Sequence, residues 1–162
     1  MIELFDEAEC LEIIQKSEQN GKWQRNNRLK KYSYFTTKLE LDNRKVNLIK
    51  DYCKEYLNLD VETLSTGILK YIPNDFFAKH IDKVDNLKFN SDFIYNVNMR
   101  LNDNYVGGDF YLNDKLFNQK VGTLYSYKSN TYHEVTKVKS GIRYSVLFYI
   151  RERDLKRKIT LV

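Results

Sequence analysis

The sequence predicts an α+β fold in which two helices come first and a closed or sandwiched antiparallel sheet follows. Apolar residues recur at helical spacing in two segments before residue 60 of the 162-residue chain. Beyond residue 60 the period changes to two, and the segments are rich in β-branched and aromatic residues. We therefore expect one domain over residues 1–162, with a helical part over about 1–58 and a β-barrel over about 61–152.

The first helix is expected in FDEAECLEIIQKSEQNGKW, with Asp6 as N-cap and Glu9 completing a capping box. It should end near Asn20-Gly21. The second is expected in RKVNLIKDYCKEYLNL, capped by Asp42 or Asn43. The apolar face of this second helix would consist of Val46, Ile49, Cys53 and Leu57.

Seven or eight short strands should follow, separated by turn-forming residues such as Pro73-Asn74-Asp75 and Gly107-Gly108. Closing the sheet on itself would remove exposed strand edges. The expected strand segments are 61–72, 76–82, 92–102, 108–113, 120–127, 132–138 and 141–152.

Composition bounds the class of protein. Hydrophobic residues make up 42% and aromatic residues 14% of the chain, which argues against disorder. No stretch approaches the roughly 18 apolar residues of a membrane-spanning helix, and the opening MIELFDEAEC lacks a signal-peptide pattern. Cys10 and Cys53 are isolated, so free thiols are the simpler alternative to a disulfide, and we expect a cytoplasmic protein. Its richness in Asn, Lys, Tyr and Ile is compatible with a virus- or phage-encoded protein.

The charge is mildly basic. A formal net charge of +5 is compatible with an anionic partner, nucleic acid included, without indicating one. The densest basic runs are Lys30–Lys31 and Arg151–Lys158, and a solvated face is the expected interpretation of both.

A possible metal site begins with His80-Ile81-Asp82. On a strand, residues i and i+2 point to the same face, so His80 and Asp82 would project together. The other histidine, His133, lies on a later predicted strand. An isolated H-x-D is usually an ordinary surface or core feature, but two histidines and one carboxylate form the facial triad of non-haem Fe(II) oxygenases.

Arg143 follows His133 by ten residues, across a predicted turn and onto the next strand. A guanidinium there could hold the far carboxylate of a 2-oxoacid cosubstrate bidentately. Ser145 would face the same way and donate a further hydrogen bond.

These residues resemble the prolyl 4-hydroxylase-like branch of the Fe(II)/2-oxoglutarate dioxygenases, over roughly the whole domain. The resemblance implies a double-stranded β-helix, a jelly-roll or cupin-like barrel, with the N-terminal helices packed on one outer face. The motifs that carry it are His80-Ile81-Asp82, Tyr105-Val106-Gly107-Gly108-Asp109-Phe110, and His133-Glu134-Val135 followed by Val138, Gly141, Arg143 and Ser145.

The resemblance also implies the ligands. Fe(II) would be held by His80, Asp82 and His133, and 2-oxoglutarate by Arg143 with Ser145 and Tyr71. Dioxygen would be the second cosubstrate, and ascorbate the accompanying reductant. Tyr71 and Ser145 could equally be ordinary core residues, and that alternative stays open here.

The implied reaction is hydroxylation of an unactivated C–H bond, first of all in a prolyl or other residue of a protein or peptide, with release of succinate and carbon dioxide. One departure concerns Asn98 and Arg100, where that branch usually has an apolar residue and a tyrosine. With Asn96 they share one strand face, which either lines a polar substrate pocket or faces solvent.

A polar pocket would favour the alternative of a free amino acid or small metabolite as substrate. Oxidation of a nucleobase is a weaker alternative, and a non-catalytic β-barrel binding module the weakest. We expect no membrane partner. The connector 83–92 would lie over the iron, either as a substrate lid or as a plain linker.

Overall fold

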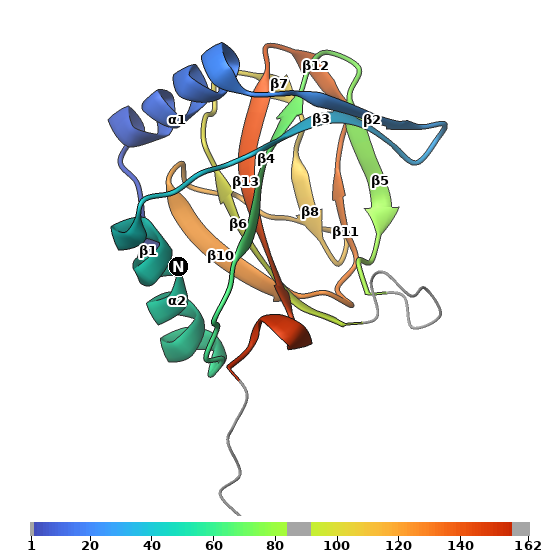
Figure 1. Cartoon of the computed structure of the whole chain (residues 1–162). Coiled ribbons are helices and arrows are strands. Elements are labelled where there is room, and N and C mark those ends of the chain that lie inside the picture. Colours follow the sequence, from blue (N-terminus) through green and yellow to red (C-terminus); the bar gives the residue numbers. More distant parts are fainter. Residues whose placement is uncertain (1, 84–91, 157–162) are drawn as a thin grey trace, which may run out of the picture.

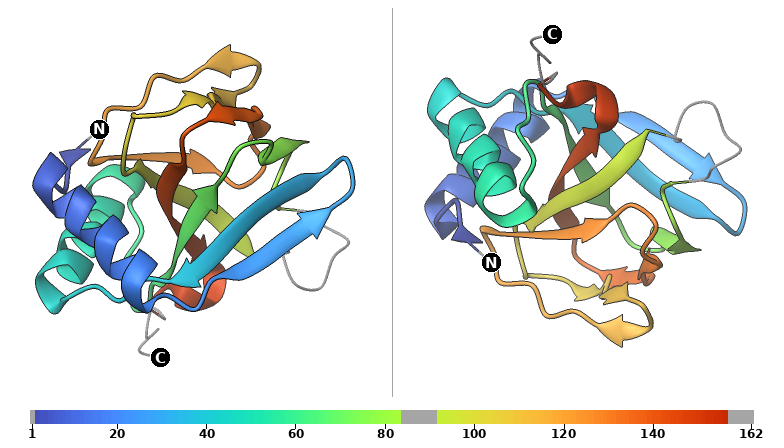
Figure 2. Two further views of the ribbon diagram at one scale, coloured as in Figure 1. Left: turned by 90° about the horizontal axis from the view of Figure 1, so that it is seen from above. Right: turned by 90° about the horizontal axis from the view of Figure 1, so that it is seen from below.

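The computed structural model describes residues 2–83 and 92–156, and the predicted lid lies almost wholly outside them. A large, mostly antiparallel sheet curls around an interior, and two helices cover one outer face (Figures 1 and 2). The sheet runs in the order β1-β10-β6-β13-β4-β3-β5-β11-β8-β9, with β2 paired to β3 and a separate pair β12-β7. The predicted α+β class is confirmed.

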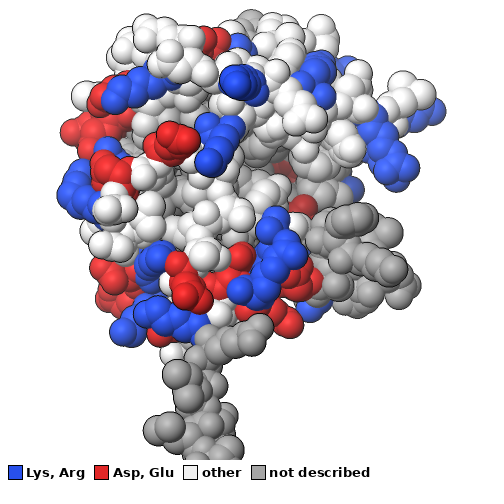
Figure 3. Space-filling view, in the orientation of Figure 1, with Lys and Arg blue, Asp and Glu red and all other residues white. Residues whose placement is uncertain are grey.

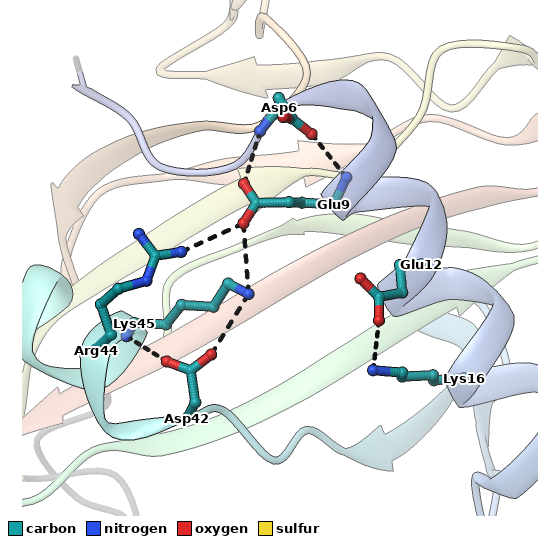
Figure 4. Close-up of polar contacts among 7 residues, drawn as sticks. All are labelled: Asp6, Glu9, Glu12, Lys16, Asp42, Arg44 and Lys45. Carbon is teal, nitrogen blue, oxygen red and sulfur yellow. Dashed lines mark hydrogen bonds and ion pairs between the residues drawn. The ribbon is translucent and has the colours of Figure 1, made fainter.

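The helices begin as the sequence predicts. Helix α1 spans Glu7–Asn20, and Asp6 and Glu9 form the expected capping box. Helix α2 spans Asn43–Leu57 with Asp42 as N-cap. Glu9 also joins the helices, because one carboxylate oxygen lies 3.4 Å from Arg44 Nη2 and 3.5 Å from Lys45 Nζ (Figure 4).

The expectation that every strand follows residue 60 is wrong. A hairpin of β2 (Gln24–Arg28) and β3 (Tyr32–Lys38) lies between the two helices, and a short β1 (Ile2–Glu3) pairs with β10. The β2 sequence QRNNR has no apolar alternation because most of this edge strand is exposed. Its extended form comes from pairing with β3, which a search for periodicity does not detect.

Each predicted strand segment beyond residue 60 contains a strand, with shifted ends. The first begins at Ser65 rather than 61, and segment 132–138 is divided between two strands. The strands are β4 (Ser65–Tyr71), β5 (Phe76–His80), β6 (Phe93–Arg100), β7 (Val106–Gly107), β8 (Phe110–Leu112), β9 (Lys115–Leu116), β10 (Thr123–Lys128), β11 (His133–Val135), β12 (Val138–Ser140) and β13 (Arg143–Arg151), followed by a 3₁₀ turn, Glu152–Asp154.

Strand β6 separates two clusters of buried residues. Val97 and Met99 belong to the core between the sheet and the helices, which also contains Ile49 and Cys53 of α2. The alternate residues Asn96 and Asn98 are buried on the opposite face, inside the barrel. The alternation predicted for β6 is therefore present, and its polar side faces the interior rather than solvent.

Candidate active site

Three potential metal ligands meet at one end of the barrel. His80 ends β5, His133 begins β11, and the pairing of these strands sets the two histidines opposite each other. Asp82 lies two residues beyond the end of β5, in a bend rather than on the strand as expected. One potential ligand atom from each residue lies within 4.8 Å of those of the other two.

Both imidazoles are oriented by backbone carbonyls. Nδ1 of His80 lies 2.8 Å from the Ala78 oxygen, and Nδ1 of His133 lies 2.9 Å from the Thr131 oxygen. A carbonyl only accepts, so each Nδ1 carries the proton and each Nε2 of a neutral ring offers a lone pair. Nε2 of His80 is buried without a hydrogen-bond partner, although Asp82 Oδ1 is 3.2 Å away.

The electrostatics favour a cation at this point. Burial raises the pKa of Asp82, but its interactions with His80, His133 and Asn96 outweigh burial, so the pKa lies below its usual value. Burial lowers the pKa of His133, although the negative charge of Asp82 acts in the opposite direction. The lowered pKa favours the neutral imidazole. A carboxylate and imidazole lone pairs directed at one another require a positive charge between them. This donor set fits Fe(II).

Asn96 completes the surroundings of Asp82. It is fully buried on β6, and its Nδ2 donates to Asp82 Oδ2. The main chain of Asp82 is held separately, because its backbone N–H donates to the Ser129 carbonyl at 2.9 Å. The predicted substrate residue Asn96 is thus placed behind a candidate ligand.

Arg143 presents a buried positive charge to the same cavity. Arg143 is 1% exposed, and no carboxylate forms an ion pair with it in the described part of the chain. Nη1 donates to Ser145 Oγ at 3.0 Å, the guanidinium carbon lies 5.4 Å from the Tyr71 ring centroid, and Nε has no partner. An unpaired buried guanidinium is costly, so this arrangement fits an anionic ligand.

Gly108 allows the arginine to lie where it does. Its φ of +62° is a left-handed conformation that favours glycine, and an added Cβ would lie 3.1 Å from Arg143 Cδ. The predicted Gly107-Gly108 turn therefore makes room for the side chain as well as reversing the chain.

One cavity joins all of these groups. It is lined by the three potential ligands together with Tyr71, Asn98, Arg143 and Ser145. Its remaining walls are largely aromatic and were not predicted from the sequence: they include Tyr34, Phe77, Phe110, Tyr127 and Tyr149. The alternating aromatic residues of YSYFTTK could have indicated a strand that contains Tyr34. The position of Tyr34 beside the metal cluster, however, depends on the β2–β3 hairpin, which was not predicted.

Arg100 lies elsewhere. Its Nε donates to the Asn102 carbonyl at 2.7 Å and its Nη1 to the Gln119 carbonyl at 3.2 Å. It lines a groove of about 290 Å³ that also touches Arg143, whereas the lining of the metal cavity does not include it. Of the three predicted substrate residues, only Asn98 borders that cavity.

A larger hollow, of about 680 Å³, lies between α1 and the connection from β3 to α2. Several of its charges are already paired, as between Glu12 and Lys16 and between Asp42 and Lys45 (Figure 4). It shares no lining residue with the metal cavity, so we assign the chemistry to the smaller space. No helix in the described ranges is long and apolar enough to cross a membrane.

Comparison with solved structures shows the same fold. A Pseudomonas putida prolyl-4-hydroxylase superposes with a TM-score of 0.70 at 14% identity, over 93% of this chain and 90% of that one. The viral collagen prolyl hydroxylase of Paramecium Bursaria Chlorella virus-1, in its 2-oxoglutarate complex, gives 0.68 at 17% identity over 93% of both chains.

A Trichoplax adhaerens prolyl hydroxylase, in complex with a hypoxia inducible factor oxygen degradation domain peptide fragment, gives a TM-score of 0.69 at 18% identity, over 91% of this chain and 79% of that one. These likenesses confirm the double-stranded β-helix. No curated protein matches the sequence.

The sequence model of the 2OG-Fe(II) oxygenase superfamily matches residues 66–151, which is more than half of the 162-residue chain. Every potential iron ligand lies within this match, as do Tyr71, Arg143 and Ser145. The predicted resemblance is thereby confirmed. The chain belongs to the 2OG-Fe(II) oxygenase superfamily and is a 2-oxoglutarate- and Fe(II)-dependent dioxygenase.

Proposed function

We propose that this dioxygenase hydroxylates an unactivated C–H bond in a prolyl or other residue of a protein or peptide. The observation that carries the proposal is one cavity with two charge requirements. The cluster of His80, Asp82 and His133 calls for a cation, and Arg143, which lines the same cavity, calls for an anion. Fe(II) and the far carboxylate of 2-oxoglutarate meet both requirements.

Each side chain has a defined task in this proposal. His80, Asp82 and His133 hold the iron, and the carbonyls of Ala78 and Thr131 keep both imidazoles in the ligating tautomer. Arg143, with Ser145 beside it, orients 2-oxoglutarate. When bound, ferrous iron supplies dioxygen activation coupled to decarboxylation of 2-oxoglutarate into succinate and carbon dioxide.

Water must be kept from the reacting centre, and the aromatic walls do this. The Phe77 ring stacks on His80 with centroids 3.8 Å apart, and Tyr127 lies 4.9 Å from His133. The Tyr71 ring, 1% exposed, covers the Arg143 guanidinium. Exclusion of water strengthens the attraction between that guanidinium and the cosubstrate carboxylate.

A peptide substrate is supported by the structural neighbours, one of which holds a peptide fragment. Asn98, a polar side chain in the cavity, favours the second candidate, a free amino acid or small metabolite. A mass gain of 16 on a proline-containing peptide would select the first. Turnover stimulated by amino acids but by no peptide would select the second. Ascorbate would act as a reductant that prolongs turnover.

The first test needs no substrate. Under anaerobic conditions, Fe(II) and 2-oxoglutarate should give a visible metal-to-ligand charge-transfer band. Arg143→Ala and His133→Ala should weaken or abolish it, while Arg44→Ala, an exposed arginine on α2, should leave it unchanged. Absence of the band from the unaltered protein would contradict the assignment and favour the non-catalytic binding module.

A further inference from the structure

Arg143 belongs to the walls of two separate spaces. Together with Phe110 it lines both the metal cavity and the groove of about 290 Å³ that contains Arg100. The lining of this groove includes none of the three potential iron ligands and not Ser145. A buried guanidinium therefore stands between the two spaces, and a ligand in either of them would act on its charge.

The groove brings two arginines together with little negative charge to balance them. Arg100 and Arg143 both line it, and neither forms an ion pair with a residue that the structure describes. The one carboxylate among the described lining residues, Asp109, is exposed to water. Over helices α1 and α2, by contrast, basic side chains lie among acidic ones (Figure 3).

Neutral groups hold Arg100 in place. Its Nε donates to the Asn102 carbonyl at 2.7 Å and its Nη1 to the Gln119 carbonyl at 3.2 Å. The guanidinium carbon lies 5.2 Å from the centroid of the Tyr105 ring. These contacts fix the orientation of the guanidinium, but they leave its charge unneutralised and do not use Nη2.

Two buried polar atoms in the walls of the groove have no hydrogen-bond partner among the described residues. One is a donor, Nε of Arg143, and the other is an acceptor, Oε1 of Gln119, which is 7% exposed. The Gln119 amide is oriented by its Nε2, which donates to the Tyr125 hydroxyl. Burial raises the pKa of Tyr125 far above its ordinary value, so this hydroxyl adds no negative charge. Unpaired buried polar atoms are costly, and a ligand that both accepts and donates would satisfy both.

Hydrogenphosphate combines these properties. Its oxygens accept hydrogen bonds from guanidinium groups, and its double negative charge matches two arginines. Its hydroxyl can also donate a hydrogen bond to an amide oxygen. Sulfate and carboxylates accept in the same way, but at neutral pH they carry no proton to donate.

We propose that the groove binds inorganic phosphate between Arg100 and Arg143, with Gln119 accepting from its hydroxyl, and that this phosphate weakens the binding of 2-oxoglutarate. Arg143 would then face an anion in each space, and two anions repel each other strongly where water is excluded. The coupling must be reciprocal, so 2-oxoglutarate would weaken phosphate binding by the same factor. The inference rests on the proposed role of Arg143 toward 2-oxoglutarate and adds a regulatory site to it.

The test measures the apparent dissociation constant of 2-oxoglutarate anaerobically, from the charge-transfer band of protein loaded with one equivalent of Fe(II). Phosphate is increased at constant ionic strength. The constant should rise about fivefold and then level off, because two sites are coupled rather than shared. Sulfate, which cannot donate, should raise it less than about twofold. The full band should return at saturating 2-oxoglutarate, which shows that phosphate has not removed the iron.

Three results would overturn the proposal. The first is a constant that phosphate does not change. The second is a rise that continues in proportion to phosphate without levelling off, because that is competition for the cosubstrate site itself. The third is an equal effect of sulfate, because the groove would then not select a proton-carrying anion.

Variants locate the effect. In Arg100→Gln the ratio of the constants measured with and without phosphate should fall to one, and retention of the full ratio would overturn the proposal. Asp109→Asn, an exposed change, should lower the phosphate concentration that gives half of the effect about twofold. An unchanged or higher concentration would count against the groove. Lys137→Gln removes an exposed cation that does not line the groove, and this matched control should keep the full effect.

The band of the unaltered protein without phosphate is a separate readout of the proposed function. Its absence would contradict the role of Arg143 toward 2-oxoglutarate, and the coupling would fall with it. A normal band that phosphate does not affect would overturn the phosphate site alone.

Discussion

Asn96 on β6 donates a hydrogen bond from Nδ2 to Oδ2 of Asp82, which lies beyond the end of β5. The relationship joins two strands that are distant in the sheet order and fixes one oxygen of a candidate ligand. The other oxygen, Oδ1, faces Nε2 of His80 at 3.2 Å. Asn96 therefore leaves Oδ1 as the oxygen that is free to bind a metal.

Replacing Asn96 by alanine should weaken metal binding about 10–100-fold, the usual effect of losing a hydrogen bond to a metal ligand. Binding of Mn(II) followed by electron paramagnetic resonance measures this without catalysis. Asn98→Ala is the matched control, since Asn98 lies two residues along the same face and its oxygen has no partner. Equal affinity of the two variants would show that Asn96 does not position Asp82.

Arg143→Leu should separate stability from cosubstrate binding. The side chain is buried without an anionic partner, so an apolar residue of similar size should leave the free energy of unfolding unchanged or raise it. In the unaltered protein loaded with Mn(II), 2-oxoglutarate at 100 times its dissociation constant should add about 2.7 kcal/mol. Denaturant unfolding of both proteins tests this. Stabilisation of the leucine variant by the same ligand would contradict the role of Arg143.

The stability of the β2–β3 hairpin should depend on Asp75, which is 2% exposed. Its carboxylate accepts hydrogen bonds from Arg25, Ser33 Oγ and the Ile72 N–H. Arg25→Ala leaves this carboxylate buried without its counter-charge and should cost roughly 3 kcal/mol of unfolding free energy. Asp75→Asn keeps an acceptor and frees a guanidinium that water can reach, so it should cost only about 1 kcal/mol. Urea unfolding of the two variants measures which one loses more free energy of unfolding. A larger loss for Asp75→Asn than for Arg25→Ala would contradict this role of Asp75.

Lys30→Gly should make the protein more stable, because Lys30 has a φ of +60°. Removing a side chain from a left-handed position should add about 1 kcal/mol to the free energy of unfolding. Lys31→Gly is the control, because Lys31 has no positive φ and should gain nothing. Thermal unfolding of the two variants side by side measures the difference, and an equal effect would remove the argument from strain.

Both thiols should be unreactive in the folded protein. Burial raises the pKa of Cys53 to about 11 and is the main reason that the pKa of Cys10 rises to about 12. Above pH 9.0, the ordinary pKa of a thiol, the unfolded chain releases protons that the folded protein keeps. The free energy of unfolding should therefore fall as the pH rises beyond that value. Titration with a disulfide reagent at pH 8 should find no thiol natively and two after denaturation. A native thiol count above zero would contradict the burial.

The sequence by itself determined the two helices, the strands beyond residue 60 and the set His80, Asp82, His133 and Arg143. Local rules suffice for these, because capping residues mark helix starts and a period of two marks strands. The chemistry of two histidines and a carboxylate is likewise readable from residue types and order. What these rules could not supply is which strands pair across the barrel.

Only the tertiary structure decided the β2–β3 hairpin, the aromatic walls and the separate positions of Asn96, Asn98 and Arg100. The polar strand β2 is extended because β3 pairs with it, a contact that no period in QRNNR encodes. Likewise, Asn96 contacts a candidate ligand while Arg100, on the same face, is held by backbone carbonyls. A face of a strand is a local property, whereas the partner that each side chain meets depends on how the sheet closes.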